Sequence, residues 1–115
     1  MFTTKDNAIN KAKQFVKLLN LNGIDVFEAY LFGSVIYNNV NENSDIDLAI
    51  VSKKFIGIPF YDIQKISKYR RIVDLKLEIH PFSIDDAIVD PTVFFIKIKN
   101  EGLQIKTLQM SIASS

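Results

Sequence analysis

Cysteine and tryptophan are both missing from this sequence of 115 residues, and histidine occurs once. Without cysteine, the chain can form no disulfide, no thiolate metal site and no cysteine nucleophile. A single histidine, His80, excludes any metal site built on two histidines, and we expect its ring to form hydrogen bonds at the end of a strand. An excess of one charge is also lacking. Because the net charge is +1, no basic field indicates nucleic acid as a partner.

Long apolar runs are absent as well. No stretch of about 18 apolar residues predicts a transmembrane helix, and the polar start of the chain, MFTTKDNAINKAK, does not resemble a signal peptide. Together with the lack of cysteine, these features predict a cytoplasmic protein with no membrane partner. No internal repeat or linker divides the chain, and 48% of its residues are hydrophobic. Residues 1–115 are therefore expected to form one domain around one core.

The hydrophobic pattern changes between helical and strand spacing along the chain. It predicts helices over residues 5–20, 60–71 and 91–100, the start of a short helix at 83–86, and strands over 26–32, 45–52, 72–80 and, weakly, 103–108. Residues 37–44 include four asparagines and predict a loop. Pro81 is expected to end the third strand. This mixture predicts an α+β fold of two layers, in which helices pack on a small mixed β-sheet.

The stretch LFGSVIYNNVNENSDIDLAIV, from Leu31 to Val51, is the most informative part of the sequence. The pair Gly33-Ser34 ends one apolar run, and Asp45 and Asp47 open the next. Alternate residues of a strand share a face, so the two carboxylates would point the same way and repel each other unless a cation lies between them. A hard divalent cation such as Mg²⁺ fits such oxygen ligands. Alternatively, Ser44 and Asp45 close a turn and one of the two aspartates pairs with a lysine.

A third carboxylate comes from the strand predicted over residues 72–80. Its polar face carries Asp74, Lys76, Glu78 and His80. Asp74 and Glu78 would lie about 13 Å apart at ~3.3 Å per residue, so only one of them can join a site at one end of the sheet. Three carboxylates from two strands, together with a Gly-Ser turn able to approach a phosphate, predict nucleotide chemistry.

Two other phosphate or metal motifs do not match. Residues 39–50 have the odd asparagine spacing of a calcium loop, but Ser44 occupies the glycine position and Ile50 the final glutamate position. The sequence also contains no GxxxxGK[ST] phosphate loop.

The chain resembles the minimal nucleotidyltransferases of the DNA polymerase beta-like superfamily. The resemblance rests on the strand end LF, on Gly33-Ser34, on ten intervening residues and on SDIDLAI from Ser44 to Ile50. The later segment LKLEIHPFS is similar to a strand in which an acidic residue precedes a His-Pro pair. On this basis Glu78 is the third carboxylate, with Asp74 as the runner-up.

The resemblance implies a chemistry and a partner. Asp45, Asp47 and Glu78 would act in catalysis and hold two Mg²⁺ ions, or Mn²⁺, while Gly33 and Ser34 would bind the phosphates of a nucleoside triphosphate, with ATP favoured. The reaction would transfer the nucleotidyl group to a hydroxyl and release pyrophosphate. Minimal nucleotidyltransferases often work with a helical HEPN-type protein as the antitoxin of a toxin–antitoxin pair, in which that partner can be the acceptor.

The chain departs from the pattern of this family in two places. Many members carry a basic residue and a glycine directly after Gly-Ser, whereas residues 35–39 here are Val-Ile-Tyr-Asn-Asn. The third carboxylate would be a glutamate, which is longer than aspartate. Two hypotheses follow: an Mg²⁺-dependent nucleotidyltransferase, or a catalytically weak binding module of the same fold that neutralises its partner by contact.

Overall fold

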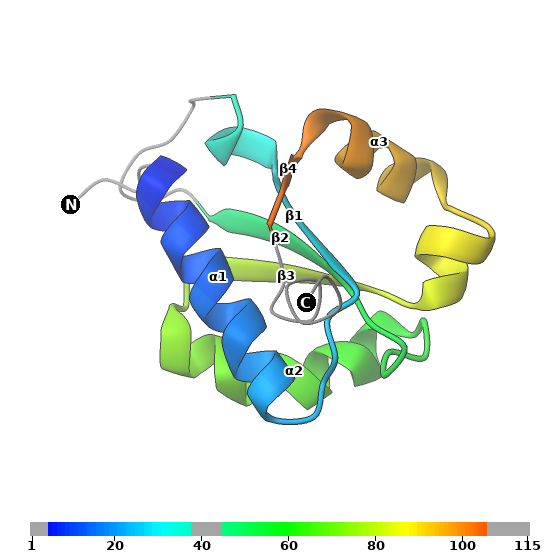
Figure 1. Ribbon diagram of the computed structural model, residues 1–115, viewed down its shortest axis with the longest axis horizontal. Helices are drawn as coiled ribbons and strands as arrows, with labels where there is room; N and C mark the ends of the chain where they lie inside the picture. Colours follow the sequence, from blue (N-terminus) through cyan, green and yellow to red (C-terminus); the bar gives the residue numbers. More distant parts are fainter. Residues whose placement is uncertain (1–4, 38–44, 106–115) are drawn as a thin grey trace, which may run out of the picture.

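The structure is a computed structural model that describes residues 5–37 and 45–105. Helices and strands alternate along the chain (Figure 1). The elements are α1 (Lys5–Leu21), β1 (Glu28–Phe32), η1 (Gly33–Val35), β2 (Ile46–Val51), α2 (Pro59–Val73), β3 (Leu77–Phe82), η2 (Asp85–Val89), α3 (Val93–Glu101) and β4 (Leu103–Gln104). Here η1 is one turn of 3₁₀-helix and η2 is a short π-helical segment.

The four strands form one mixed sheet in the order β3-β2-β1-β4. β1 pairs antiparallel with both β2 and β4, whereas β2 and β3 run parallel. Five of the six residues of β2 are buried, which agrees with the apolar run LAIV that predicted burial on both faces. The predicted α+β fold, a small mixed sheet with helices packed on it, is confirmed.

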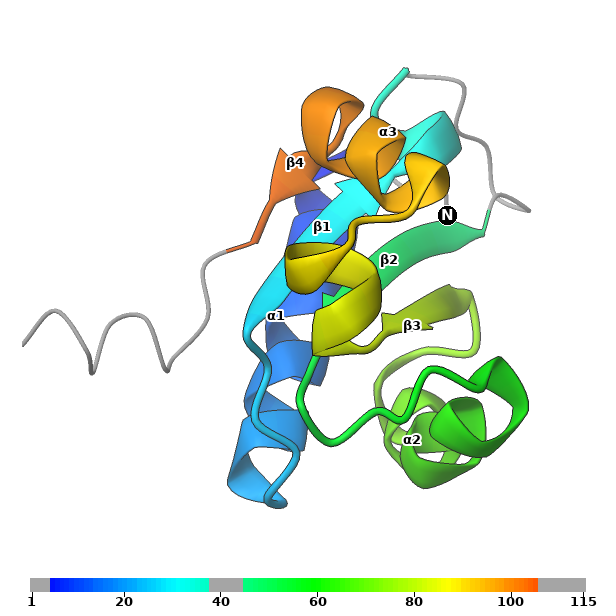
Figure 2. The ribbon, with the colours of Figure 1, turned by 90° about the vertical axis from the view of Figure 1, so that its right-hand side faces the viewer.

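The larger core lies between the sheet and helices α1 and α2. Helix α1 buries the stripe that its sequence spacing predicts: Ala8, Ala12, Phe15, Val16 and Leu19. These side chains pack with Ile66 and Tyr69 of α2 and with residues of all three longer strands, including Leu31, Leu48 and Ile79. Figures 1 and 2 show both helices on the same side of the sheet.

The opposite face of the sheet is covered by η2 and α3 over part of its area (Figure 2). A second apolar cluster forms there from Tyr30, Ala49, Val51, Phe82, Ala87, Phe95 and Ile98. The Thr92 side chain caps α3 by accepting a hydrogen bond of 3.1 Å from the Phe95 N–H. The charged residues of β2 and β3 lie on this same face, beyond the apolar cluster, because alternate strand residues share a side.

The boundaries predicted for the third strand were wrong. Helix α2 continues to Val73, because Ile66, Tyr69 and Val73 repeat at helical spacing and pack into the core. β3 begins only at Leu77 and runs through Pro81 to Phe82. Since the carbonyls of residues 76 and 82 accept hydrogen bonds from the β2 side, the nitrogen of Pro81 faces the free edge of the sheet, where a strand tolerates proline.

The other predicted elements are present with shifts of a few residues, and β4 is limited to two residues of the predicted strand 103–108. Residues 106–108 of that strand lie outside the described residues, as do residues 38–44 of the predicted loop, including Ser44. Among the helices that the structure describes, none combines the length and the hydropathy needed to cross a membrane.

A buried carboxylate shapes the connection between β2 and α2. Asp62, with its side chain 1% exposed, accepts hydrogen bonds of 2.9 Å from the backbone N–H groups of Ile56 and Gly57. Lys65 lies 3.8 Å from the same carboxylate. Because two of its acceptor positions are satisfied by backbone donors, the buried charge fixes the loop in one conformation.

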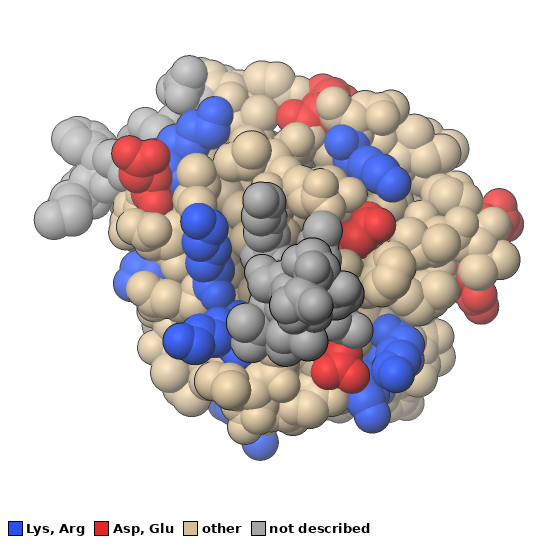
Figure 3. Space-filling model, viewed as in Figure 1, with Lys and Arg blue, Asp and Glu red and all other residues tan. Residues whose placement is uncertain are grey.

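The surface carries both signs of charge. On the face shown in Figure 3, acidic and basic side chains both occur and neither sign covers the whole face. This distribution agrees with the net charge of +1.

Candidate functional site

Three strands bring the predicted site residues to one end of the sheet. The register pairs Phe32, the last residue of β1, with Asp47 of β2, and pairs Asp47 with Glu78 of β3. Gly33 follows directly on β1. The end of β1 and the beginnings of β2 and β3 therefore meet, because β1 runs antiparallel to β2 whereas β2 and β3 are parallel.

Asp47, Glu78 and His80 form the group best suited to hold a cation in the part of the chain that is described. One ligand atom from each side chain lies within 4.8 Å of the others. Opposite ligands of an octahedral Mg²⁺ ion are about 4.2 Å apart, since each bond is about 2.1 Å long. The group is accessible: the side chains of Asp47 and His80 are 24% and 27% exposed, and Glu78 is exposed.

The chemistry of these donors fits a divalent metal. Two carboxylates supply the oxygen ligands that Mg²⁺ prefers, whereas an imidazole nitrogen is a donor preferred by transition metals. The His80 Nε2 atom lies 3.2 Å from Oδ1 of Asp47, so the ring can also orient that carboxylate by a hydrogen bond.

Gly33 is required where β1 turns into η1. Its φ of +78° lies in the left-handed region that residues with a Cβ rarely adopt. A Cβ at this position would lie 2.5 Å from Oδ2 of Asp47, closer than any van der Waals contact allows. The turn and the Asp47 carboxylate thus lie against each other, at the end of the sheet where the sequence predicted that the Gly-Ser and Asp-x-Asp motifs could meet. Ser34, half-buried, follows in the first turn of η1.

Asp45 lies just before β2 rather than within it. Its exposed side chain lines a pocket of about 450 Å³ together with Glu78 and His80. Ser67 and Arg70 of α2 line the same pocket from the opposite side. Asp45 therefore lies near Glu78 and His80, but it does not belong to the group whose ligand atoms lie within 4.8 Å of one another.

Of the two candidates for the third carboxylate, the structure places Glu78 beside Asp47. Asp74 instead terminates α2, where it is the C-cap residue. Its side chain accepts a hydrogen bond of 2.8 Å from the Lys76 N–H and closes the turn into β3. The longer helix explains the difference, since it places Asp74 in a turn and not on the strand.

His80 is the residue that the sequence interpretation undervalued. It forms the hydrogen bond expected at a strand end, but that bond is to Asp47. Its ring packs edge-on against Phe32 and Phe94, with centroid distances of 4.9 and 5.9 Å. The signal was its spacing of two residues from Glu78, which puts both side chains on one face of a strand.

The fold is shared with proteins of known structure. A crystal structure of a protein proposed to be a nucleotidyltransferase, from Sulfolobus solfataricus, aligns with a TM-score of 0.67 and 16% identity, covering 91% of this chain and 85% of that one. A chain from a crystal structure of a toxin–antitoxin with AMP-PNP aligns with a TM-score of 0.53 and 22% identity, covering 90% of this chain and 76% of that one. No curated protein sequence matches the chain.

These likenesses define a domain with the nucleotidyltransferase fold. The sequence profile of polymerase beta nucleotidyltransferases matches residues 10–109. The chain belongs to that family, and it is a minimal nucleotidyltransferase-type domain, as the resemblance of its Gly-Ser and Asp-x-Asp motifs predicted.

Proposed function

We propose that this protein is a metal-dependent nucleotidyltransferase that moves AMP from ATP to a hydroxyl group of a partner protein. The proposal rests on one observation. Ligand atoms of Asp47, Glu78 and His80 lie within 4.8 Å of one another, and Gly33 lies directly beside Asp47. A carboxylate group and a glycine turn at the same point are what a metal-bound triphosphate requires. Because ATP is the donor, the cytoplasm is the expected compartment.

Asp45, Asp47 and Glu78 are the proposed ligands of the metal, which is Mg²⁺ or Mn²⁺ with two ions in the full site. When bound, the metal neutralises charge on the phosphates and on the leaving pyrophosphate. In the reaction, the acceptor oxygen forms a bond to the α-phosphorus, and the bond from that phosphorus to the bridging oxygen breaks. Pyrophosphate leaves. Glu78, which is exposed, would help to activate the acceptor hydroxyl by taking its proton.

Gly33 and Ser34 are proposed to hold the phosphates. The absence of a side chain at Gly33 lets the Asp47 carboxylate lie against this turn, so phosphates held by the turn would lie beside that carboxylate. Ser34 offers its N–H and its hydroxyl as donors. The described residues that follow, Val35 to Tyr37, include no cation, so the phosphate charge at this turn would be met by the bound metal, by Lys53 or Lys54, or by the partner.

A protein partner fits both the comparisons and the surface. One structural neighbour comes from a toxin–antitoxin structure with AMP-PNP. In this chain Ile56, Ile58, Phe60 and Tyr61 are 49–67% exposed, and all four lie within six residues, in the loop before α2 and in its first turn. Asp62 holds that loop in place, so these apolar side chains are preorganised for contact. We propose that they contact a helical HEPN-type partner, with this chain as the antitoxin.

The alternative is a binding module that neutralises the partner by contact alone. The apolar surface of Ile56, Ile58, Phe60 and Tyr61 favours it, as does the lack of a cation after Ser34. The two functions differ in what the carboxylates do. In the enzyme they are essential, whereas in the binding module they can be replaced.

The experiment that separates them is a transfer assay with labelled ATP, Mg²⁺ and the product of the adjacent gene as partner. We expect label on the partner with the wild type and none with Asp45→Ala/Asp47→Ala. Asp74→Asn is the control, because it alters an acidic residue outside the group. No transfer by the wild type, with neutralisation intact in the double variant, would refute the enzymatic function in favour of the binding module.

A further inference from the structure

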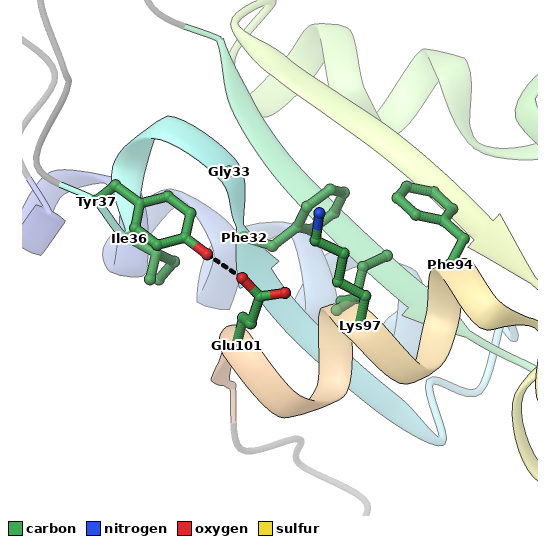
Figure 4. Close-up of a pocket in the computed structure, with 8 residues that line it drawn as sticks. Phe32, Gly33, Ile36, Tyr37, Phe94, Lys97 and Glu101 are labelled. Atoms are coloured by element: carbon green, nitrogen blue, oxygen red, sulfur yellow. Dashed lines mark hydrogen bonds between the residues drawn. The ribbon is translucent and has the colours of Figure 1, made fainter.

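A second pocket adjoins the proposed phosphate site, between η1 and α3 (Figure 4). Its volume is about 230 Å³, and Phe32, Ile36, Phe94 and Ile98 form its apolar walls. Sites for whole drug-sized ligands measure roughly 300–1,000 Å³. This pocket is therefore suited to one ring system of a larger ligand whose remainder lies outside it.

The pocket and the carboxylate group share a wall. The ring of Phe32 packs against Phe94 inside the pocket, with centroids 5.8 Å apart, and against His80 on the other side, at 4.9 Å. Gly33, the next residue, both lines the pocket and contacts Asp47. A ligand that places a ring in the pocket would therefore have its phosphates near Gly33, the residue that lies against Asp47.

Three polar side chains also line this apolar pocket. Lys97 and Glu101 stand one turn apart on α3, and Figure 4 shows Glu101 beside Tyr37 and Lys97 between Glu101 and Phe94. The Tyr37 hydroxyl donates a hydrogen bond to Glu101. That bond, with smaller contributions from burial and from the Glu101 charge, raises the pKa of Tyr37, so the phenol remains a donor to the carboxylate. Glu101, held by Tyr37, thus offers the pocket an acceptor, and Lys97 offers it a cationic donor.

We propose that this pocket binds the base of the nucleoside triphosphate, and that Lys97 and Glu101 select adenine. The proposal rests on the proposed function and adds to it the residues that determine base preference. Apolar and aromatic walls favour the large flat face of a purine. Glu101 accepts from the exocyclic amino group of adenine, and Lys97 donates to a ring nitrogen. A base with a carbonyl in place of the amino group would put two acceptors together at Glu101.

Calorimetric titration with Mg²⁺-ATP, Mg²⁺-UTP and Mg²⁺-tripolyphosphate tests the proposal. Tripolyphosphate carries the phosphates without a base, so it separates the two parts of the site. We expect ATP to bind more tightly than UTP, and Lys97→Ala and Glu101→Gln to weaken ATP binding about tenfold or more, because each loses a charge-assisted hydrogen bond. Binding of tripolyphosphate should not change in either variant.

Lys99→Ala is the matched control. It removes the same charge from an exposed position of the same helix, but Lys99 does not line the pocket. We expect it to bind ATP as the wild type does. Since all three residues are exposed, the variants should fold, and thermal unfolding verifies this.

Two results would overturn the assignment of the pocket. The first is ATP binding that is unchanged in both Lys97→Ala and Glu101→Gln. The second is a loss of tripolyphosphate binding in Lys97→Ala that equals its loss of ATP binding, because Lys97 would then contact the phosphates and not the base. A wild type that binds neither ligand would instead overturn the proposed function, and this assignment with it.

Discussion

Replacing Gly33 by alanine perturbs the backbone and the carboxylate group together. Gly33 has a φ of +78°, and its added Cβ would meet Oδ2 of Asp47 at 2.5 Å. Gly23 offers a matched control, because its φ of +83° is similar and nothing lies within 4 Å of the Cβ that alanine would add. The comparison isolates the contact with Asp47 from the strain of the left-handed conformation.

The expected magnitudes follow from these contacts. A left-handed conformation costs a residue with a Cβ about 1–2 kcal/mol, so both variants should lose about that much stability. At roughly 4 °C per kcal/mol for a domain of this size, the melting temperature falls by about 4–8 °C. In Gly33→Ala, the separation from Oδ2 must also grow from 2.5 Å to an ordinary contact of 3.4 Å. This shift strains the hydrogen bond between His80 and the Asp47 carboxylate, which should lower the free energy of unfolding further, by about 0.5–1.5 kcal/mol.

The functional effect should differ far more than the stability. Moving a catalytic carboxylate by close to 1 Å can reduce the rate about 100-fold. We therefore expect Gly33→Ala to lose label transfer about 100-fold and Gly23→Ala to retain it, when both are assayed below their melting temperatures. Equal activity in the two variants would refute the argument that the contact between Gly33 and Asp47 positions the site.

Two further predictions concern stability. Asp62→Ala removes the buried acceptor of two backbone hydrogen bonds, from Ile56 and Gly57, and should lower the free energy of unfolding in urea by about 2–4 kcal/mol. Lys65→Ala removes only the exposed partner of Asp62 and should lower it by under about 1 kcal/mol. Equal losses would contradict the role given to the buried carboxylate. Burial, followed by the hydrogen bond to Glu28, raises the pKa of Tyr30 above its usual value of 10.0. Because the pKa of Tyr30 is higher in the folded state than in the unfolded state, its contribution to stability is complete below pH 10 and is lost as the pH rises further. Above pH 10, the urea concentration at the unfolding midpoint should therefore fall more in the wild type than in Tyr30→Phe.

Much of the fold and of the site could be predicted because the determining signals are local. Helix α1 has a clear apolar stripe, and β2 is a short apolar run with Asp47 near its start and Asp45 just before it. The spacing of Gly33-Ser34 from Asp45 and Asp47 placed both motifs at one end of the sheet, as the pairing of Phe32 with Asp47 confirms. Where the sequence pattern matches one secondary structure, prediction succeeds.

The errors arose where two patterns overlap or where long-range contacts decide. Val73 fits the apolar spacing of both α2 and a following strand, and packing against the α1 side of the core favours the helix. That choice moves Asp74 into a turn and leaves Glu78 beside Asp47. The pocket between η1 and α3 could not be predicted, because Tyr37 and Glu101 meet only through the tertiary fold.

The most direct test of the account is the binding of ATP to the wild type and to Asp47→Ala, measured by calorimetry with Mg²⁺ and again with a chelator in place of the metal. The account predicts binding that requires Mg²⁺ and that weakens at least about tenfold when Asp47 is replaced, since Asp47 is a proposed metal ligand within 4.8 Å of ligand atoms of Glu78 and His80. ATP binding that is equally tight with the chelator, or that does not change in Asp47→Ala, would contradict it.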